Sequence, residues 1–133
     1  MDITTYNFKT VRDNRGDLTV IEGSIDIPFE IKRIYYIFNT TSGLKRGCHA
    51  HKSLNQVYVC VKGSCKVLLD DGKSKEVVYL DEPWKGLFIG NMVWREMYEF
   101  SADCVLLVLA SAHYDENDYI RNYNDFTRAV NQR

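Results

Sequence analysis

The sequence predicts an all-β sandwich or barrel with one short helix near its C-terminal end. Short apolar segments follow one another and are separated by turn signals such as Lys62-Gly63-Ser64 and Asp70-Asp71-Gly72. Turn signals at intervals of about 8–12 residues favour a sandwich or barrel over a parallel sheet with crossover helices. The 133 residues contain no repeat, low-complexity tract or proline-rich linker, which predicts a single domain over residues 1–133.

Six apolar segments rich in β-branched and aromatic residues are the expected strands. They lie within residues 18–22, 31–38, 56–61, 65–69, 87–90 and 105–110. Helical spacing is found only near the C-terminus, in a stripe formed by Tyr119, Ile120, Tyr123, Phe126 and Val130. Asp115 or Asn117 is placed to cap the start of this helix. We interpret the stripe as a packing face rather than as part of a cofactor site.

Composition excludes several classes of partner. The net charge of −1 provides no basic field for binding nucleic acid or an acidic membrane, so a few placed cations must hold any anionic ligand. Residues 1–5 lack the charged and apolar regions of a secretory signal. No apolar run approaches the ~20 residues of a membrane span. We expect a cytoplasmic protein whose partners include neither nucleic acid nor membrane.

The cysteines carry no recognisable metal or redox motif. Cys48, Cys60, Cys65 and Cys104 form no Cys-x-x-Cys pair, which argues against a zinc ribbon or a thioredoxin-like motif. Scattered single cysteines are typical of a reducing compartment. Cys60 and Cys65 could face each other across a hairpin, but we favour buried free thiols.

The most informative stretch is Arg46-Gly47-Cys48-His49-Ala50-His51. Histidines at positions i and i+2 of a strand point to the same face, because the side-chain period of a strand is two. Four residues separate His51 from Gln56, and six more separate Gln56 from Gly63. This spacing matches the first cupin motif, with Gln56 at the position of its glutamate. In the second cupin motif, Arg95 stands where a further histidine is usual.

These two replacements predict a site without a metal ion and without any other cofactor. A cupin metal needs about four nitrogen or oxygen ligands. The Gln56 amide is a poor ligand, and the guanidinium of Arg95 would repel a cation. The imidazoles of His49 and His51 suit proton abstraction at neutral pH. Arg95 can stabilise a developing oxyanion and lower the pKa of nearby histidines.

Other interpretations of these residues stay open at this point. His49 and His51 could be surface residues of a strand. His113 is expected in a solvated loop, and alternation along the strand places Cys48 on the face opposite the histidine pair.

Two short elements resemble those of a known enzyme family. Asp13-Asn14-Arg15-Gly16 resembles the Asp-x-Arg-Gly element of the dTDP-4-dehydrorhamnose 3,5-epimerases, and Arg46-Gly47-Cys48-His49 resembles their Arg-Gly-x-His element. The whole chain is more similar to the dTDP-4-keto-6-deoxy-glucose 3,4-ketoisomerases. That resemblance covers nearly all of the chain and includes residues 31–36, 49–52 and 114–121.

The resemblance implies a homodimeric jelly-roll barrel of the cupin type that binds a dTDP-linked keto-sugar. His49 and His51 become the proton-transfer pair, assisted by Arg95. The implied substrate-binding residues are Arg15, Arg46, Lys52, Tyr35, Tyr36 and Gln56, with the two arginines at the diphosphate or sugar. Core packing remains the alternative for the tyrosines, and a solvated amine remains the alternative for Lys52.

The implied reaction converts dTDP-4-keto-6-deoxy-glucose to a dTDP-3-keto-6-deoxyhexose through an enediolate, in deoxy-amino-sugar biosynthesis for lipopolysaccharide or another glycan. The arginine at position 95 resembles the residue of family members that form the gluco product. Arg15 instead resembles the residue of members that form the galacto product. We favour the gluco product. The alternatives are a 3,5-epimerase and a non-catalytic cupin that binds a sugar nucleotide. A metal-dependent oxygenase ranks last.

Overall fold

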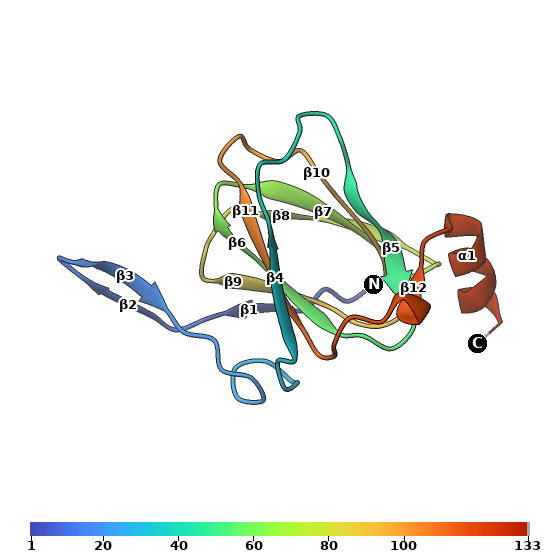
Figure 1. The fold of residues 1–133 in the computed structure, drawn as a ribbon, viewed down its shortest axis with the longest axis horizontal. Helices are drawn as coiled ribbons and strands as arrows, with labels where there is room; N and C mark the ends of the chain where they lie inside the picture. The colour runs from blue at the N-terminus through green and yellow to red at the C-terminus, as the bar shows by residue number, and fades with distance from the viewer. Residues whose placement is uncertain (133) are drawn as a thin grey trace.

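The computed structural model describes residues 1–132 and consists mainly of two antiparallel sheets that face each other (Figure 1). The first sheet has the order β1 (Thr5–Asn7), β9 (Lys85–Ile89), β6 (Gln56–Lys62), β11 (Val105–Ala110) and β4 (Arg33–Ile37). The second has the order β12 (Tyr119–Ile120), β5 (Arg46–His51), β10 (Trp94–Tyr98), β7 (Cys65–Asp70) and β8 (Lys75–Leu80). The predicted all-β architecture is thereby confirmed.

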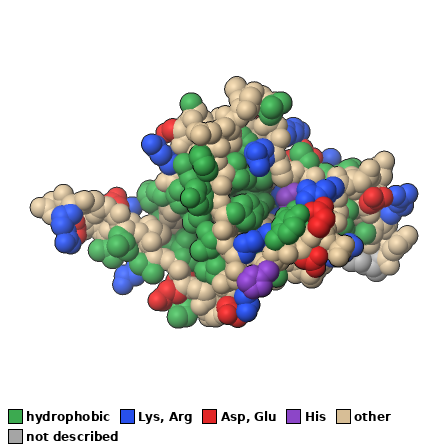
Figure 2. Space-filling view, viewed as in Figure 1, with side chains coloured by type: hydrophobic (Ala, Val, Ile, Leu, Met, Phe, Trp, Pro, Cys, Tyr) green, Lys and Arg blue, Asp and Glu red, His purple; other side chains and the backbone are tan. Residues whose placement is uncertain are grey.

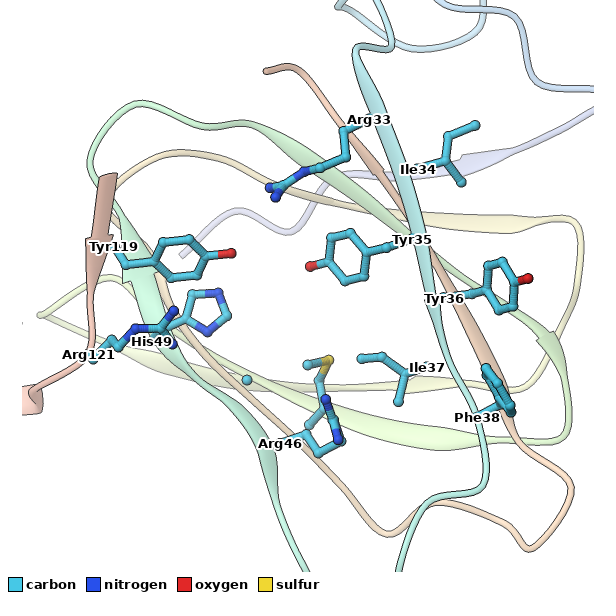
Figure 3. Close-up of a pocket in the computed structure, with 12 residues that line it drawn as sticks. Arg33, Ile34, Tyr35, Tyr36, Ile37, Phe38, Arg46, His49, Tyr119 and Arg121 are labelled. Carbon is cyan, nitrogen blue, oxygen red and sulfur yellow. The ribbon is translucent and has the colours of Figure 1, made fainter. Parts of the chain in front are cut away.

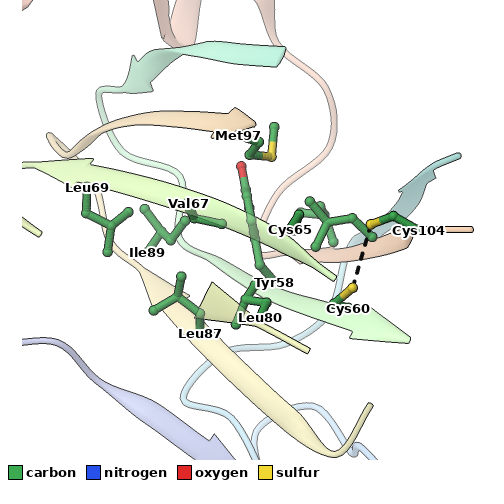
Figure 4. Packing of buried hydrophobic residues seen from close by; sticks show 12 residues of the cluster. Tyr58, Cys60, Cys65, Val67, Leu69, Leu80, Leu87, Ile89, Met97 and Cys104 are labelled. Atoms are coloured by element: carbon green, nitrogen blue, oxygen red, sulfur yellow. Dashed lines mark hydrogen bonds between the residues drawn. The ribbon is translucent and has the colours of Figure 1, made fainter. Parts of the chain in front are cut away.

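The space between the sheets is filled by one apolar cluster (Figure 4). Tyr58, Val67, Leu87 and Leu106 are among its members, and each is less than 1% exposed. The outer face of β6 is also covered, because Val57 and Val59 pack against Phe8 and Ile27 in a second cluster. A strand buried on both faces is apolar throughout rather than alternating, which is the pattern of its sequence.

A two-stranded ribbon stands apart from both sheets. Its strands are β2 (Thr10–Asp13) and β3 (Gly16–Thr19), which pair only with each other. Figure 1 shows the ribbon extending away from the rest of the molecule. Val11 and Leu18 on the ribbon are 48% and 57% exposed. An isolated hairpin is marginally stable in water, and this ribbon contacts the rest of the chain through Arg12, which lies 5.0 Å from the Trp84 ring.

The C-terminal helix starts later than the sequence predicts. Tyr119 and Ile120 belong to β12, which pairs with His51 and Ala50 of β5. The helix α1 (Tyr123–Asn131) is capped by Asn122, whose side chain accepts a hydrogen bond from the Asp125 amide.

The reason for this difference lies just before β12. Asp115 caps only the short 3-10 helix η1 (Glu116–Asp118) rather than α1. The chain then completes the edge of the second sheet, and this pairing overrides the helical periodicity of Tyr119 and Ile120. The prediction of a packing face holds for Phe126, which is fully buried against Trp94 and Ile120, but is wrong for Tyr119, which lines a pocket.

The cysteines are all free, as expected. Cys60, Cys65 and Cys104 are buried, and Cys48 is exposed on the outer face of β5. None of the helices within residues 1–132 combines the length and the apolar character needed to cross a membrane.

Candidate active site

A pocket of about 500 Å³ opens between β4 of the first sheet and β5 of the second (Figure 3). Arg33, Tyr35 and Ile37 project into it from alternate positions of β4, while Tyr36 and Phe38 lie on the other side of that strand. The facing wall is formed by Arg46, Gly47 and His49 of β5, with Met97, Tyr119 and Arg121. The free edge of β4 thus forms one lip of the pocket.

The predicted histidine pair is buried at this wall. His49 is 6% exposed and His51 is fully buried. Their Nε2 atoms are 3.1 Å apart, at hydrogen-bond distance, and their rings meet at 89°. The Tyr119 ring packs against both imidazoles, with centroid distances of 5.0 and 4.3 Å. The alternative that the histidines are surface strand residues is therefore wrong.

Asp118, which was not predicted from the sequence, contacts His51 on the side away from His49. Its Oδ2 atom lies 3.1 Å from His51 Nδ1. The other carboxylate oxygen accepts hydrogen bonds from the Ser53 amide and hydroxyl, and the Leu54 amide also donates to this carboxylate. Burial alone would raise the pKa of Asp118, but the hydrogen bonds from Ser53 and His51 outweigh it and lower the pKa.

Both histidines are neutral at physiological pH. Burial is the main reason, because it disfavours the charged imidazolium, and the nearby guanidinium of Arg95 adds to it. These effects lower the pKa of His49 to about 2 and that of His51 to about 4, even though Asp118 opposes the shift at His51.

The hydrogen bonds then fix the tautomers of the pair. An ionised Asp118 only accepts, so His51 donates from Nδ1 and its Nε2 carries the lone pair. The 3.1 Å contact between the rings consequently requires His49 to donate from Nε2. Nδ1 of His49 remains as the basic nitrogen of a pocket-lining residue. The pair therefore presents one neutral imidazole to the pocket, with a second imidazole behind it.

A second series of hydrogen bonds runs from Arg95 to Tyr35 on the opposite wall of the pocket. Arg95 Nη1 donates to Gln56 Oε1 at 2.5 Å, and Gln56 Nε2 donates to the Tyr35 hydroxyl at 3.1 Å. Burial raises the pKa of Tyr35, so its phenol stays protonated. Because the Tyr35 oxygen accepts from Gln56, its own proton is free to be donated into the pocket. Figure 3 shows the Tyr35 hydroxyl directed into the space in front of His49.

Arg95 and Gln56 lie behind the pocket rather than at its surface. Both are fully buried. Arg95 also donates from Nε and Nη2 to the Val93 carbonyl, and no carboxylate within residues 1–132 forms an ion pair with it. The sequence predicted that Arg95 can stabilise a developing oxyanion. Within this chain its hydrogen bonds reach the pocket only through Gln56.

Three guanidinium groups surround the pocket. Arg46 was predicted, whereas Arg33 and Arg121 were not. Arg33 lies over the rings of Tyr35 and Tyr114, and its Nε is buried without a hydrogen-bond partner. Arg121 lies 4.1 Å from the Tyr119 ring and pairs with Glu116. Arg33 and Arg121 lie within residues 31–36 and 114–121, which resemble the family. That resemblance is the only sequence signal that could have indicated them, because no motif spacing places them at the pocket.

Three further predicted binding residues, besides Gln56, do not point into the pocket. Arg15 is at the tip of the β2–β3 ribbon, where it pairs with Asp13 and its side chain is 86% exposed. Lys52 is exposed beyond the end of β5, and Tyr36 points outward from β4. Within a single chain these residues do not meet the histidine pair. His113 lies in an exposed loop, as expected.

Comparison with known proteins places the chain in a family. The family described as FdtA: WxcM-like, C-terminal matches residues 1–131. The chain belongs to this family. It is 52% identical over 130 residues to the TDP-4-oxo-6-deoxy-alpha-D-glucose-3,4-oxoisomerase of Aneurinibacillus thermoaerophilus, which covers 98% of this chain and 94% of the relative.

Solved structures of family members share the fold. A histidine-to-asparagine mutant of the 3,4-ketoisomerase from Thermoanaerobacterium thermosaccharolyticum, in complex with TDP-4-keto-6-deoxyglucose, gives a TM-score of 0.96 at 47% identity, over 98% of this chain and 95% of that chain. The TDP-quinovose 3,4-ketoisomerase from Campylobacter jejuni gives 0.91 at 50% identity, over 96% and 98%. The predicted relationship to the 3,4-ketoisomerases and the cupin-type fold are confirmed.

The lowered histidine pKa values predict that this family member loses stability in acid. Below about pH 6.5 the unfolded chain binds protons at His49 and His51 that the folded chain does not bind. The free energy of unfolding should therefore fall as the pH drops from about 6.5 toward 4, by about 1.4 kcal/mol per pH unit for each histidine. Urea unfolding at several pH values measures the slope.

The variant His51→Asn removes one of these groups, so its slope should be smaller by about 1.4 kcal/mol per pH unit. Thr41→Ala, in an exposed loop, is the control and should keep the slope of the unmodified protein. Equal slopes for His51→Asn and the unmodified protein would contradict the lowered pKa of His51.

Proposed function

We propose that this chain is a 3,4-ketoisomerase that converts TDP-4-keto-6-deoxyglucose to TDP-3-keto-6-deoxyglucose without a metal ion. The observation that carries the proposal is the placement of a neutral base and a protonated phenol, His49 and Tyr35, on opposite walls of one cation-lined pocket. The complex of a relative at 47% identity with TDP-4-keto-6-deoxyglucose supports the choice of substrate.

His49 acts as the base in this proposal. The C3 proton of the sugar is acidic because it is α to the C4 carbonyl, and Nδ1 of His49 takes it. The electron pair moves to the C4 oxygen and gives an enediolate. His51 and Asp118 stabilise the resulting imidazolium, because the proton on His49 Nε2 is hydrogen-bonded to His51 and the carboxylate lies behind it.

Tyr35 acts as the acid from the other wall. The C3 hydrogen that is removed and the C4 hydrogen of the gluco product lie on opposite faces of the sugar ring. A single base on one face would return the proton to that face and give the galacto product. The Tyr35 phenol, held by Gln56 and Arg95, supplies a donor on the second face. This arrangement supports the gluco product.

The protons balance without a redox step. Carbon C3 loses a proton to His49, carbon C4 gains one from Tyr35, and one proton passes from the C3 oxygen to the C4 oxygen. The imidazolium of His49 then returns a proton to the tyrosinate through water, which restores both groups. The carbonyl has moved from C4 to C3.

The cupin fold often holds a metal ion, but the residues present here do not fit one. In His51, Nδ1 faces Asp118 and Nε2 faces His49, so both ring nitrogens are already engaged. The remaining two positions of the motif hold the amide of Gln56 and the guanidinium of Arg95, which are bonded to each other. The buried charge of Arg95 takes the place of a cation beside the histidines.

The two proposed steps can be separated by deuterium exchange. In D₂O, Tyr35→Phe should still exchange the C3 hydrogen of the substrate but form the 3-keto product at least ~10² times more slowly. His49→Asn should lose both exchange and isomerisation by a similar factor. NMR of the sugar follows both signals, and Tyr79→Phe, at an exposed tyrosine of β8 away from the pocket, is the control.

Activity should persist in EDTA, because the proposed site uses no metal ion.

Other outcomes of the D₂O experiment would identify the alternatives. Deuterium at C5 would indicate a 3,5-epimerase. No change of the sugar with the unmodified protein would indicate a non-catalytic sugar-nucleotide-binding protein. Loss of C3 exchange in Tyr35→Phe together with retention in His49→Asn would reverse the proposed roles of the two residues.

The gluco product should be recognisable from its proton couplings. The labile 3-keto product is converted by a 3-aminotransferase to an amino sugar, and the H3–H4 and H4–H5 couplings are measured. We expect large diaxial couplings, because an equatorial C4 hydroxyl follows from protonation by Tyr35 on the second face. Small couplings would indicate the galacto product and would contradict the roles proposed for Tyr35 and Arg95.

We also propose a homodimer in which Arg15 of one chain serves the pocket of the other. The ribbon exposes Val11 and Leu18, and the outer side of β4 exposes Tyr36 and Phe38 beside the pocket lip. Figure 2 shows hydrophobic side chains gathered over this region. An edge strand with an apolar outer face is a template for a partner, and a partner's ribbon has matching surface to bury.

Mixed dimers test this arrangement. Arg15→Ala and His49→Asn homodimers should both be nearly inactive, whereas a co-purified heterodimer should regain about half of the unmodified activity, because one pocket receives both intact residues. If Arg15 served its own chain, the heterodimer would remain inactive.

Light scattering should give twice the 15.5 kDa of one chain, and Leu18→Glu should give the single-chain mass.

A further inference from the structure

The three buried cysteines form one compact cluster at the end of the barrel core (Figure 4). Cys60 lies on β6, Cys65 lies on β7, and Cys104 immediately precedes β11. Their sulfur atoms all lie within 4.8 Å of one another, and the Cys60 and Cys104 sulfurs are 3.6 Å apart. The isomerase mechanism uses none of them. Their spacing in the sequence gives no motif, so only the fold brings them together.

Hydrogen bonds fix the two segments that carry the cluster. Ser64 donates from its amide to the Ser101 hydroxyl at 2.9 Å, and the Ser101 amide donates to the Ser64 carbonyl at 2.9 Å. Cys104 donates from its amide to the Ser101 carbonyl at 3.1 Å. The turn between β6 and β7 is therefore tied to the segment before Cys104, and the sulfur positions are set by backbone contacts.

Gly63 makes this close approach possible. It has a φ of +71°, and a Cβ atom there would lie 2.9 Å from the Cys104 Cα and 2.2 Å from the Ser101 hydroxyl. Any other residue would push the two segments apart. The two segments that carry the thiols are thus held at short range by a turn that excludes a side chain.

We propose that Cys60, Cys65 and Cys104 form a three-sulfur site for a soft monovalent cation, Cu(I). Three metal–sulfur bonds of about 2.3 Å in a plane place the sulfurs about 4.0 Å apart, so the present sulfur positions need only small shifts. Thiolates select soft d¹⁰ cations over hard ones. The site is separate from the proposed catalytic pocket and does not rest on the proposed function.

Burial favours a monovalent ion over Zn(II). A charge inside an apolar core is costly unless it is neutralised. Cu(I) is neutralised when one of the three thiols loses its proton to solvent, whereas Zn(II) requires two thiolates and prefers a fourth ligand. Within residues 1–132 the group of closely placed metal-ligating side chains contains these three cysteines and no further member. Coordination involves no change in oxidation state.

Cys104 is the member of the cluster nearest to solvent. It is 2% exposed and is among the residues that line a surface pocket of about 420 Å³, together with Lys62, Asp103, and Tyr36 and Phe38 of β4. The partner's ribbon would cover Tyr36 and Phe38 in the dimer proposed above, so we expect an ion to enter on the side of Lys62 and Asp103. The other side of the cluster is the closed apolar core.

Competition with a coloured chelator tests the proposal. Under anaerobic conditions, the protein should withdraw one Cu(I) per chain from its complex with bicinchoninate, and the absorbance of that complex should fall in proportion. Cys60→Ala and Cys104→Ala should each reduce this transfer at least ~10-fold, as expected when a metal ligand is removed. Cys48→Ala, at the exposed cysteine, is the matched control and should transfer as the unmodified protein does.

Further readouts keep the result independent of folding and of catalysis. Circular dichroism establishes that each variant is folded, and Cys60→Val preserves core volume if the alanine variant is unstable. His49→Asn should bind Cu(I) normally, because its pocket lies elsewhere. Loss of transfer in Cys48→Ala but not in Cys60→Ala, or no transfer by the unmodified protein, would overturn the proposal. Equal or tighter binding of Zn(II) would overturn the assignment of a monovalent ion.

Discussion

The buried guanidinium of Arg95 is the constraint on which the rest of the pocket depends. It is fully buried, it cannot lose its proton, and hydrogen bonds to Gln56 and to the Val93 carbonyl are its contacts. A buried charge without a carboxylate partner costs several kcal/mol of folding free energy. The chain tolerates that cost beside two imidazoles, which indicates that the charge has a use there. It adds to the effect of burial in keeping His49 and His51 neutral, and it would favour the anionic intermediate of the proposed mechanism.

The same residue links the two walls of the pocket. Through Gln56 it is linked to the hydroxyl of Tyr35, so the acid and the base of the proposed mechanism both depend on one buried group. A metal ion at this position would polarise the substrate directly, whereas Arg95 acts through a neighbour and through its field. A change at Arg95 therefore alters the position of Tyr35 as well as the charge. Under the proposed mechanism, this coupling is how Arg95 would influence the stereochemistry of the product without touching the sugar.

Much of the fold and the centre of the site could be predicted from the sequence. Strand periodicity and turn residues predicted the sheets, and the motif spacing predicted that His49 and His51 lie close to Gln56 and Arg95. Asp118 and Tyr119 could not be predicted to lie at the site. They are brought there by the pairing of β12 with β5, two strands that are more than 60 residues apart in the chain. The periodicity near Tyr119 instead favoured a helix, and the pairing with His51 overrode it.

Arg15 shows a different limit of the sequence. Its resemblance to a family element suggested a role at the substrate, yet one chain holds it at the tip of a ribbon far from the histidines. Side-chain types along a sequence do not say which copy of the chain they serve. The exposed apolar residues of the ribbon and of β4 supply that information, because both surfaces need cover and one can cover the other. In the proposed dimer, pocket completion and dimer formation would follow from a single contact, and an isolated chain would lack Arg15 at its pocket.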